Sequence, residues 1–282
     1  MPELPEVETM VRGVRPHVIG RVISAFEACP NHCRPIMMQP ALRVQARTAI
    51  GKRIVDVRRR AKRVVIDIEG GAAFVIEPRM TGLVLLSDPP DPGHLRVVWR
   101  FDDGGDYDAL WFWDRRGLGT VSLLEGDELA RILGNEFLGV DALDMTEADW
   151  IALCRDTSRE IKVALLDQKR VAGIGNLYAS EILHKAGISP RRKAHRLTRR
   201  EIQAIATCSR EILESAILHE GSTLSDGTYR NALNKSGGYQ NAHQVYAREG
   251  ELCFRCAAPI RRIVQAQRAT FYCPGCQRGR GA

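Results

Sequence analysis

The spacing of apolar residues changes several times along the chain, and each change predicts a different kind of element. In the first segment, residues 6–18, apolar side chains recur at helical spacing: Val7, Met10, Val11 and Val14. That spacing places them on one face of an amphipathic helix. Pro16 and Gly20 predict where the helix ends.

A strand-like pattern replaces the helical one from residue 21 to about residue 124. Six stretches rich in Val, Ile, Phe and Trp lie at 21–26, 42–47, 55–68, 73–86, 95–101 and 110–124. Clusters of Gly, and of Pro with Asp, separate several of them, as expected of strands joined by turns. Several short strands at this spacing predict a β-sandwich or a flattened barrel.

Helical periodicity returns after about residue 140. Helices are expected near 146–156, 159–169, 176–187 and 198–219. Two of them begin with a capping box, Thr146 with Asp149 and Thr198 with Glu201. Residues 221–246 are polar and rich in Gly, which predicts a loop with some short helix.

The last part of the chain, from about residue 247, is short and carries closely spaced cysteines. Together with the two preceding patterns, it predicts a multidomain α+β protein. We expect three domains, formed by residues 1–140, 141–246 and 247–282.

Basic residues outnumber acidic ones. There are 41 Lys and Arg against 34 Asp and Glu, which gives a formal charge of +7 and a pI of about 9.1. This balance favours a polyanionic partner, because basic side chains neutralise phosphates and release counterions. The basic residues form two runs: Arg58, Arg59, Arg60, Lys62 and Arg63, then Arg191, Arg192, Lys193 and Arg196. Each run is either a solvated face or part of a phosphate-binding surface.

The sequence also predicts where the protein works. No apolar run is long enough to cross a bilayer. The acidic residues Glu3, Glu6 and Glu8 near the start argue against a secretory or transit peptide. We therefore expect a cytoplasmic protein with no membrane partner.

Four cysteines near the end have the spacing of a metal site. Cys253 and Cys256 form one Cys-x-x-Cys pair, and Cys273 and Cys276 form a second. Four thiolates satisfy tetrahedral zinc and leave no open position, so we expect one structural Zn²⁺. Between the pairs we expect a β-hairpin in which Arg268 either contacts DNA phosphate or is an ordinary surface arginine.

Three further possible ligands, Cys29, His32 and Cys33, lie close together. No fourth ligand accompanies them. We interpret this cluster as a loop with free thiols rather than as a second metal site. Cys154 and Cys208 fall on expected helices and are interpreted as core residues.

The chain begins with Met1 and Pro2. Removal of the methionine would leave Pro2 with a free secondary amine, and an α-amino group has a pKa of about 7.7–8.0. A neutral amine attacks electrophilic carbon to form an iminium ion, as Schiff-base lysines do. Met-Pro starts are common, so this feature alone predicts no chemistry.

Several motifs, in order, resemble the formamidopyrimidine-DNA glycosylases, the Fpg branch of the family that also contains endonuclease VIII. They are Pro-Glu-Leu-Pro-Glu-Val-Glu-Thr from Pro2, Arg-Arg-Ala-Lys at 59–62, the segment 167–181, Gln-Val-Tyr at 244–246 and Gln-Arg-Ala-Thr at 267–270. The resemblance covers essentially the whole chain. Leu4 stands where endonuclease VIII proteins usually have Gly, which favours the Fpg branch.

The resemblance implies a fold and a partner. The fold is a β-sandwich with an N-terminal helix, then a helix–two-turn–helix module and a β-hairpin zinc finger. The partner is damaged double-stranded DNA, held in a basic cleft between the parts, with the damaged nucleotide turned out of the stack. It also implies a monomer of bacterial type that works at the nucleoid.

The resemblance assigns catalytic roles to three residues. Pro2 is the nucleophile at the sugar C1′, and Glu3 is the general acid/base that protonates the ring oxygen. Lys62 contacts phosphate near the lesion and aids catalysis. The alternatives are a carboxylate favoured at a helix start for Glu3 and a solvated basic run for Lys62.

A phosphate clamp is implied in the helical region. Gly173 and Gly175 allow a close backbone approach, and Asn176 is expected to cap the next helix and face an anion. Lys162 matches a further phosphate ligand of the family, and Arg268 of the finger completes the set. The alternative for Asn176 is a plain helix cap.

Other residues are implied to manage the opened duplex. Met80, Arg116 and Leu118 match the side chains that fill the void left by the flipped base. The segment 114–119 departs from the commoner Asp-Pro-Arg-Arg-Phe-Gly, so an apolar wedge replaces a stacking ring. Residues 221–239 match the loop that covers the flipped base. A core methionine and an ordinary loop are the alternatives for Met80 and for this segment.

The implied activity is excision of 8-oxoguanine and formamidopyrimidines, followed by β- and δ-elimination from the same covalent intermediate. This is a bifunctional DNA glycosylase and abasic-site lyase. One alternative is an endonuclease VIII-like glycosylase for oxidised pyrimidines. The other is a non-catalytic DNA-binding relative that retains the clamp and the finger.

Overall fold

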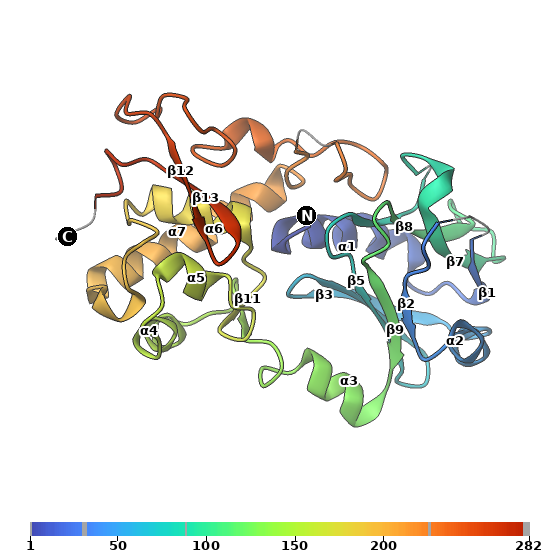
Figure 1. The fold of residues 1–282 in the computed structure, drawn as a ribbon. Helices are drawn as coiled ribbons and strands as arrows, with labels where there is room; N and C mark the ends of the chain where they lie inside the picture. The colour runs from blue at the N-terminus through green and yellow to red at the C-terminus, as the bar shows by residue number, and fades with distance from the viewer. Residues whose placement is uncertain (1, 30–32, 88, 225–226, 279–282) are drawn as a thin grey trace. The chain divides into compact units, whose positions relative to one another are not determined.

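The computed structural model describes residues 2–29, 33–87, 89–224 and 227–278. Helices and strands are mixed along the chain, so the expected α+β class is confirmed (Figure 1). The contacts group into two compact units. The N-terminal unit comprises Met1–Leu133 with Ile217–Gln240, and the C-terminal unit comprises Gly134–Ala216 with Asn241–Ala282. The three-domain division stays a prediction.

The chain opens with the expected amphipathic helix, α1 (Leu4–Val18). Its apolar face is buried in the core of the N-terminal unit. The helix start is fixed by a backbone–carboxylate hydrogen bond, in which the N–H of Glu3 donates to Glu6 Oε2 at 2.9 Å. This bond satisfies a backbone donor that the helix itself leaves without a partner.

Two β-sheets form the rest of the N-terminal unit. The first has the order β1 (Ile23–Ala28), β7 (Leu95–Phe101), β8 (Ala109–Asp114) and β6 (Gly82–Leu85). The second has the order β2 (Met37–Gln39), β9 (Thr120–Leu124), β5 (Ala73–Glu77), β4 (Arg63–Ile68) and β3 (Ile54–Arg60). All neighbours are antiparallel except β2 and β9. Buried residues of both sheets and of α1 form one core, which is sandwich packing.

Three of the expected strands are in fact strand pairs. Residues 55–68 form β3 and β4, residues 73–86 form β5 and β6, and residues 110–124 form β8 and β9. The chain turns between β3 and β4 at Ala61, whose φ is 57°. This angle lies in the left-handed region, which alanine rarely adopts, so the residue type gives no sign of a turn. Polar residues, with Pro or Gly at the second and third turns, do mark these positions, but each break is short and the apolar pattern resumes directly after it.

Residues 42–47 were expected to be a strand, and that prediction is wrong. They belong to helix α2 (Leu42–Ala49), whose buried positions are Gln45 and Ala49. Gln45 is buried because its amide donates to the carbonyls of Pro40 and Val121. A polar residue on the buried face hides the helical period. Helix α3 (Gly126–Leu133) was not expected.

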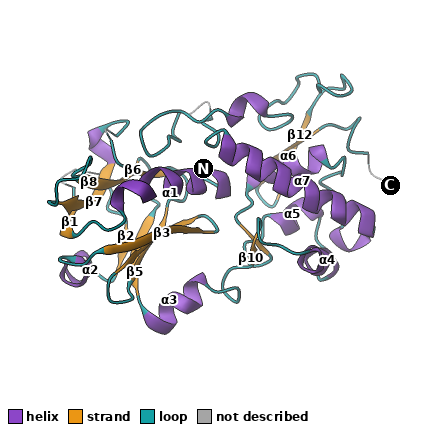
Figure 2. Ribbon diagram, turned by 180° about the vertical axis from the view of Figure 1, so that it is seen from behind, coloured by secondary structure: helices purple, strands orange, loops and turns teal. Residues whose placement is uncertain are grey.

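The C-terminal unit is mainly helical, as expected (Figure 2). It contains α4 (Glu147–Arg155), α5 (Ile161–Leu165), α6 (Asn176–Lys185) and most of α7 (Arg199–Leu218), with β10 (Val140–Asp141) and β11 (Val171–Ala172) paired in parallel. Both expected capping boxes form. Helix α5 is shorter than the expected 159–169.

The chain ends in a hairpin of β12 (Arg261–Gln265) and β13 (Arg268–Tyr272). Three short 3₁₀ helices, η1 (Pro92–His94), η2 (Ala194–Arg196) and η3 (Tyr239–Ala242), complete the described elements. Among the residues that the structure describes, no helix combines the length and the apolar character needed to cross a bilayer.

Candidate functional site

Pro2 and Glu3 lie at the buried start of α1. The Glu3 side chain is only 3% exposed, and the Glu3 backbone N–H is held by Glu6. The Glu3 carboxylate in turn accepts the backbone N–H of Glu6, so the two residues form a capping box at the start of α1. The helix-start contact that was the alternative for Glu3 is therefore present, and the general acid/base role beside Pro2 stays a prediction.

Glu6 also connects α1 to the loop 221–239. Its Oε1 accepts the N–H of Ser222 at 2.9 Å, and the hydroxyl of Tyr229 donates to the Glu6 carbonyl at 3.3 Å. Gly221 has a φ of 77°, and a Cβ there would lie 3.0 Å from Glu6 Cγ, so only glycine fits. The expected loop is thus bound to the start of α1 through Ser222 and Tyr229, while its residues 225 and 226 lie outside the described part of the chain.

Lys62 occupies the turn between β3 and β4 and is half-buried. Its neighbour Arg59 donates to Glu8 Oε2 at 2.9 Å and to the Ala61 carbonyl at 3.0 Å. The Arg59 side chain is 8% exposed, so it is not part of a solvated face. Arg59 therefore fixes the turn that carries Lys62 beside α1, a role that the sequence motif does not reveal.

Other arginines of this basic run also bind within the protein. Arg58 donates two hydrogen bonds to Asp67, at 2.6 and 3.0 Å. Arg60 donates to the Leu133 carbonyl. Arg63 pairs with Glu77 and donates to the Ile132 carbonyl. These side chains hold the sheet edge and α3, which reduces the charge that the run presents to a phosphate.

Met80, Arg116 and Leu118 lie on two turns, one between β5 and β6 and the other between β8 and β9. Met80 and Leu118 are 38% and 37% exposed, so Met80 is not a core methionine, and the role of both as wedges stays a prediction. The adjoining residues join the turns. Thr81 Oγ1 donates to the buried Asp114 and accepts the N–H of Arg116 at 3.0 Å.

Asp114 organises the second turn further. Its Oδ2 accepts the N–H of Gly119 at 2.8 Å, and its Oδ1 accepts the N–H of Arg116 at 3.2 Å. Arg96 donates to the Asp114 carbonyl from the neighbouring strand. The buried Asp114 carboxylate thus fixes the backbone conformation of the turn that carries Arg116 and Leu118.

Arg115 connects this turn to the loop 221–239. Its Nη2 donates to Thr228 Oγ1 at 2.9 Å. Arg115 stands where the commoner motif has Pro, which could make no such bond. The sequence shows the departure from the motif, but only the fold shows the partner.

We expect Asp114→Asn to loosen the void-filling turn. One amide face would present N–H groups to the N–H of Gly119 or of Arg116, which leaves a buried donor unsatisfied at a cost of about 1–3 kcal/mol. Two quantities should decrease: the preference for one opposite base, measured by single-turnover excision opposite each base, and the free energy of unfolding, measured in urea. Thr81→Val is the matched variant, because it removes one hydroxyl and keeps the carboxylate. An Asp114→Asn enzyme with unchanged stability and discrimination would contradict this account.

In the C-terminal unit, Lys162 is fully buried. Its Nζ donates to Asn176 Oδ1 at 2.6 Å, to the Ala269 carbonyl at 3.1 Å and to Thr270 Oγ1 at 2.6 Å. Three acceptors surround an ammonium that has three protons. In this geometry Lys162 joins α5, α6 and the finger hairpin, and it orients Asn176. Its contact with phosphate stays a prediction.

Asn176 is the first residue of α6, and Gly175 occupies the cap position without a side-chain cap. The expected capping role of Asn176 is therefore wrong, because its side chain turns to Lys162 and to the Ala269 carbonyl. One amide proton goes to Ala269 at 2.9 Å. Gly173 has a φ of 104°, in keeping with the tight backbone expected there.

Arg268 begins β13 and is exposed, directly after the hairpin turn at Ala266 and Gln267. Its neighbour Ala269 is the residue whose carbonyl meets Lys162 and Asn176. The fold thus brings two expected phosphate-binding residues, Asn176 and Arg268, to adjoining parts of one unit.

The two basic residues should differ when tested. Arg268→Gln should lower the slope of log affinity against log salt by about 0.9, as loss of one phosphate contact requires, without changing stability. Lys162→Met should instead reduce the free energy of unfolding by about 3 kcal/mol, because it strands buried acceptors. DNA binding over a salt series and urea unfolding measure both effects. An unchanged salt slope in Arg268→Gln would contradict its assignment.

The four expected zinc ligands come together. The sulfur atoms of Cys253, Cys256, Cys273 and Cys276 lie within 4.8 Å of one another. The distance is 3.8 Å from Cys253 to Cys276 and 3.3 Å from Cys256 to Cys273. Tetrahedral Zn–S bonds of about 2.3 Å require sulfurs about 3.8 Å apart, so the residues fit a structural zinc.

The local backbone also affects the four sulfur atoms. A hydrogen bond from the Ala258 backbone is the main cause that lowers the pKa of Cys256, whereas burial raises the pKa of Cys273 and of Cys276, so the site as a whole reaches its four-thiolate form only with a metal to balance the charge. A Cβ at Gly275 would lie 2.8 Å from Cys256 Sγ, so a larger residue would push into the site.

The remaining cysteines do not form a second centre among the described residues. Cys33 Sγ donates to the Gly93 carbonyl, and burial raises the pKa of Cys29 and of Cys154 to about 11. Cys29 and Cys154 are therefore thiols at neutral pH. His32, like Met1, lies outside the described residues, so that part of the loop interpretation stays a prediction.

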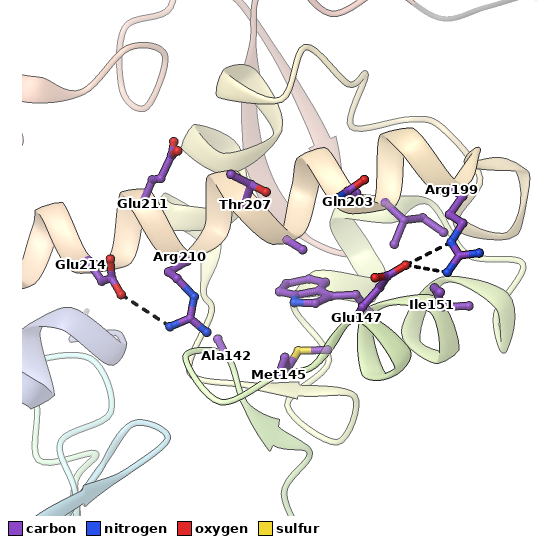
Figure 3. A pocket seen from close by; sticks show the side chains of 13 residues that line it. Ala142, Met145, Glu147, Ile151, Arg199, Gln203, Thr207, Arg210, Glu211 and Glu214 are labelled. Carbon is purple, nitrogen blue, oxygen red and sulfur yellow. Dashed lines mark hydrogen bonds and ion pairs between the residues drawn. The ribbon is translucent and has the colours of Figure 1, made fainter.

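A surface hollow of about 380 Å³ lies between α4 and α7 (Figure 3). Ion pairs line it, with Glu147 bound to Arg199 and Glu214 bound to Arg210. It holds none of the expected site residues, and its remaining carboxylate, Glu211, pairs with Lys185. The hollow is not the candidate site.

Three domain families match the chain. Residues 1–121 match the formamidopyrimidine-DNA glycosylase N-terminal domain. Residues 138–228 match the formamidopyrimidine-DNA glycosylase H2TH domain. Residues 250–279 match a zinc finger found in FPG and IleRS.

Relatives match over nearly the whole length. A formamidopyrimidine-DNA glycosylase of Ruegeria pomeroyi is 37% identical, over 99% of this chain and 100% of the relative. The crystal structure of MutM (Fpg) from Thermus thermophilus has 36% identity and a TM-score of 0.85, over 98% of each chain. A Lactococcus lactis Fpg mutant in complex with Fapy-dG-containing DNA has 31% identity and a TM-score of 0.86, over 99% of this chain and 100% of the other. From its buried proline start to its four-cysteine finger, this chain belongs to the formamidopyrimidine-DNA glycosylase family.

Proposed function

We propose that the protein is a bifunctional DNA glycosylase and abasic-site lyase that removes oxidised purines, 8-oxoguanine and formamidopyrimidines, from duplex DNA. Its family membership supports the reaction class. The Lactococcus lactis relative bound to Fapy-dG-containing DNA supports the substrate class. The single observation that carries the proposal is the sheltered placement of Glu3 directly beside Pro2 at the start of α1.

The proposed chemistry begins at Pro2. With Met1 removed, the secondary amine attacks the sugar C1′ as the bond from C1′ to the base breaks, and the base leaves with a proton. Glu3 protonates the ring oxygen O4′ so that the sugar opens to an iminium ion. The iminium acidifies the C2′–H bond, and loss of that proton expels the 3′ phosphate. The resulting conjugated iminium acidifies the C4′–H bond, and loss of this second proton expels the 5′ phosphate. Water releases the enzyme.

Other residues hold the DNA during these steps. Asn176 and Arg268 are proposed to bind backbone phosphates. Lys162 orients the Asn176 amide by donating a hydrogen bond to its Oδ1. Lys62, held by Arg59, is proposed to contact phosphate next to the lesion. Fixing the substrate in this way lowers the entropic part of the barrier.

The void in the opened duplex is proposed to be filled by Met80, Arg116 and Leu118. Two of these are apolar and partly exposed at turn tips, as wedges require. The loop 221–239, docked on Glu6, is proposed to cover the flipped base. The zinc centre has no role in the chemical steps and stabilises the finger.

We also propose the domain boundaries 1–140, 141–246 and 247–282, with support from the ranges of the three matching families. The protein is proposed to act as a monomer in the bacterial cytoplasm at the nucleoid. That location is where its duplex DNA substrate would be found.

Borohydride trapping tests the proposed function. Incubation with duplex DNA containing 8-oxoguanine opposite cytosine, with borohydride present, should yield a covalent protein–DNA adduct. Mass spectrometry of the adduct should place the sugar on Pro2. Tight binding with no adduct at any lesion would instead identify a non-catalytic DNA-binding relative.

A second comparison distinguishes the substrate class. Single-turnover excision should be faster for 8-oxoguanine and formamidopyrimidines than for oxidised pyrimidines in the same duplex. Faster excision of the pyrimidines would favour the endonuclease VIII-like alternative.

A further inference from the structure

The C-terminal end of α6 contacts the zinc centre. His184, in the last turn of α6, is 1% exposed, and its Nε2 lies 3.6 Å from the Sγ of Cys253. In the reverse direction, Arg255 donates from Nη1 to the His184 carbonyl at 3.2 Å. Because Arg255 lies between the ligands Cys253 and Cys256, both contacts involve the same metal-binding turn.

Glu181, one turn earlier on α6, fixes the chain that leads into this turn. Its carboxylate accepts the backbone N–H groups of Gln244, Val245 and Tyr246 at 2.9, 3.0 and 2.8 Å. A buried carboxylate with three donors is a rigid anchor. The approach of His184 to Cys253 is therefore set by several contacts and is not left to one flexible side chain.

The chemistry of the site determines which atom of the His184–Cys253 contact donates the hydrogen bond. A zinc-bound cysteine is a thiolate, which accepts hydrogen bonds and donates none. The His184 Nε2 must therefore carry the proton. Nδ1 is buried and has no hydrogen-bond partner among the described residues, which suits a ring nitrogen without a proton better than a stranded N–H.

We propose that His184 belongs to the zinc centre as a hydrogen-bond donor to the Cys253 thiolate and that this bond slows zinc release. Four thiolates place excess negative charge on one ion, and an N–H donor disperses part of it. Partners that touch a metal ligand rather than the metal commonly control how firmly the metal is held. The proposal concerns zinc retention and does not depend on the glycosylase reaction.

Zinc release from the purified holoprotein tests the proposal. A chromogenic chelator in excess reports the rate at which zinc leaves. His184→Leu, which removes the donor, should release zinc about tenfold faster, the lower end of the effect known for such partners. His184→Gln, whose amide nitrogen reaches a position similar to Nε2, should stay within about threefold of wild type.

A matched variant distinguishes a lost donor from a loosened helix. Leu183→Ala creates a cavity at the neighbouring, fully buried position of α6 without removing a donor from a ligand sulfur. Its zinc release should stay near the wild-type rate. If Leu183→Ala releases zinc as fast as His184→Leu, or if His184→Leu matches wild type, the proposal is wrong.

A measurement on the wild-type holoprotein does not depend on how the variants fold. Nitrogen-15 NMR of the imidazole identifies which ring nitrogen carries the proton. The expected result is a proton on Nε2 of His184. A proton on Nδ1 alone would exclude donation to Cys253 and overturn the proposal.

Discussion

An enzyme with one serine inserted ahead of Pro2 should lose covalent trapping and strand cleavage by at least about 10³-fold, the scale on which removal of a nucleophile acts. The insertion converts the proline nitrogen into an amide, which is not nucleophilic. The new terminal amine lies a residue away, about 3.5 Å along the chain, and cannot substitute for it. Borohydride trapping on 8-oxoguanine duplex and gel analysis of the cleaved strand measure the loss.

Two controls distinguish lost chemistry from lost binding. The inserted variant should bind a duplex with a stable abasic analogue about as tightly as wild type, because the phosphate contacts are untouched. Glu3→Gln keeps the amine, so it should still form a trapped adduct at a preformed abasic site while excising bases slowly. Wild-type levels of adduct in the inserted variant would exclude Pro2 as the nucleophile.

The fold could be predicted from the sequence wherever local spacing carries the signal. The helix of residues 6–18 and the capping boxes at Thr146 and Thr198 are confirmed because each depends on neighbours within one or two turns. Helix α2 was missed because Gln45 is buried through bonds to a distant carbonyl. The strand pairs were merged because the polar turn that joins each pair is short and the apolar pattern resumes directly after it.

The candidate site follows the same rule. The four cysteines could be identified because ligand spacing in a metal-binding turn is local. The roles of Arg59 and Lys162 could not, since each depends on partners that only the fold supplies: Glu8 for Arg59, and the finger hairpin for Lys162. A basic run in a sequence therefore does not distinguish an arginine that holds a turn from one that meets phosphate.

His184 and Glu181 show most clearly which residues cannot be identified from the sequence. Both lie within or beside a recognised motif, and neither carries a signal of its own. Their partners, Cys253 and the backbone of 244–246, are about sixty or more residues further along the chain. Side chains that support a site from outside it are found only once the tertiary structure is known.

The largest structural effect should come from the zinc ligands. Cys273→Ser removes a thiolate from a buried position and should reduce zinc content from one per chain to none. A structural zinc site contributes about 10–16 kcal/mol in isolated finger peptides, so the hairpin β12–β13 cannot stay ordered without it. The hairpin presents Arg268 and supplies two of the three acceptors of Lys162, so specific DNA affinity should fall by about 10²-fold or more.

Metal analysis, thermal unfolding and DNA titration measure these outcomes together. The N-terminal unit has its own core of two sheets and α1, so its unfolding transition should persist in Cys273→Ser. Cys208→Ser is the matched control, because it replaces a cysteine on α7 of the same unit that is no part of the four-sulfur cluster. A Cys273→Ser protein that retains stoichiometric zinc and wild-type affinity would show that the four sulfurs do not form the metal site, and the hairpin would need another source of order.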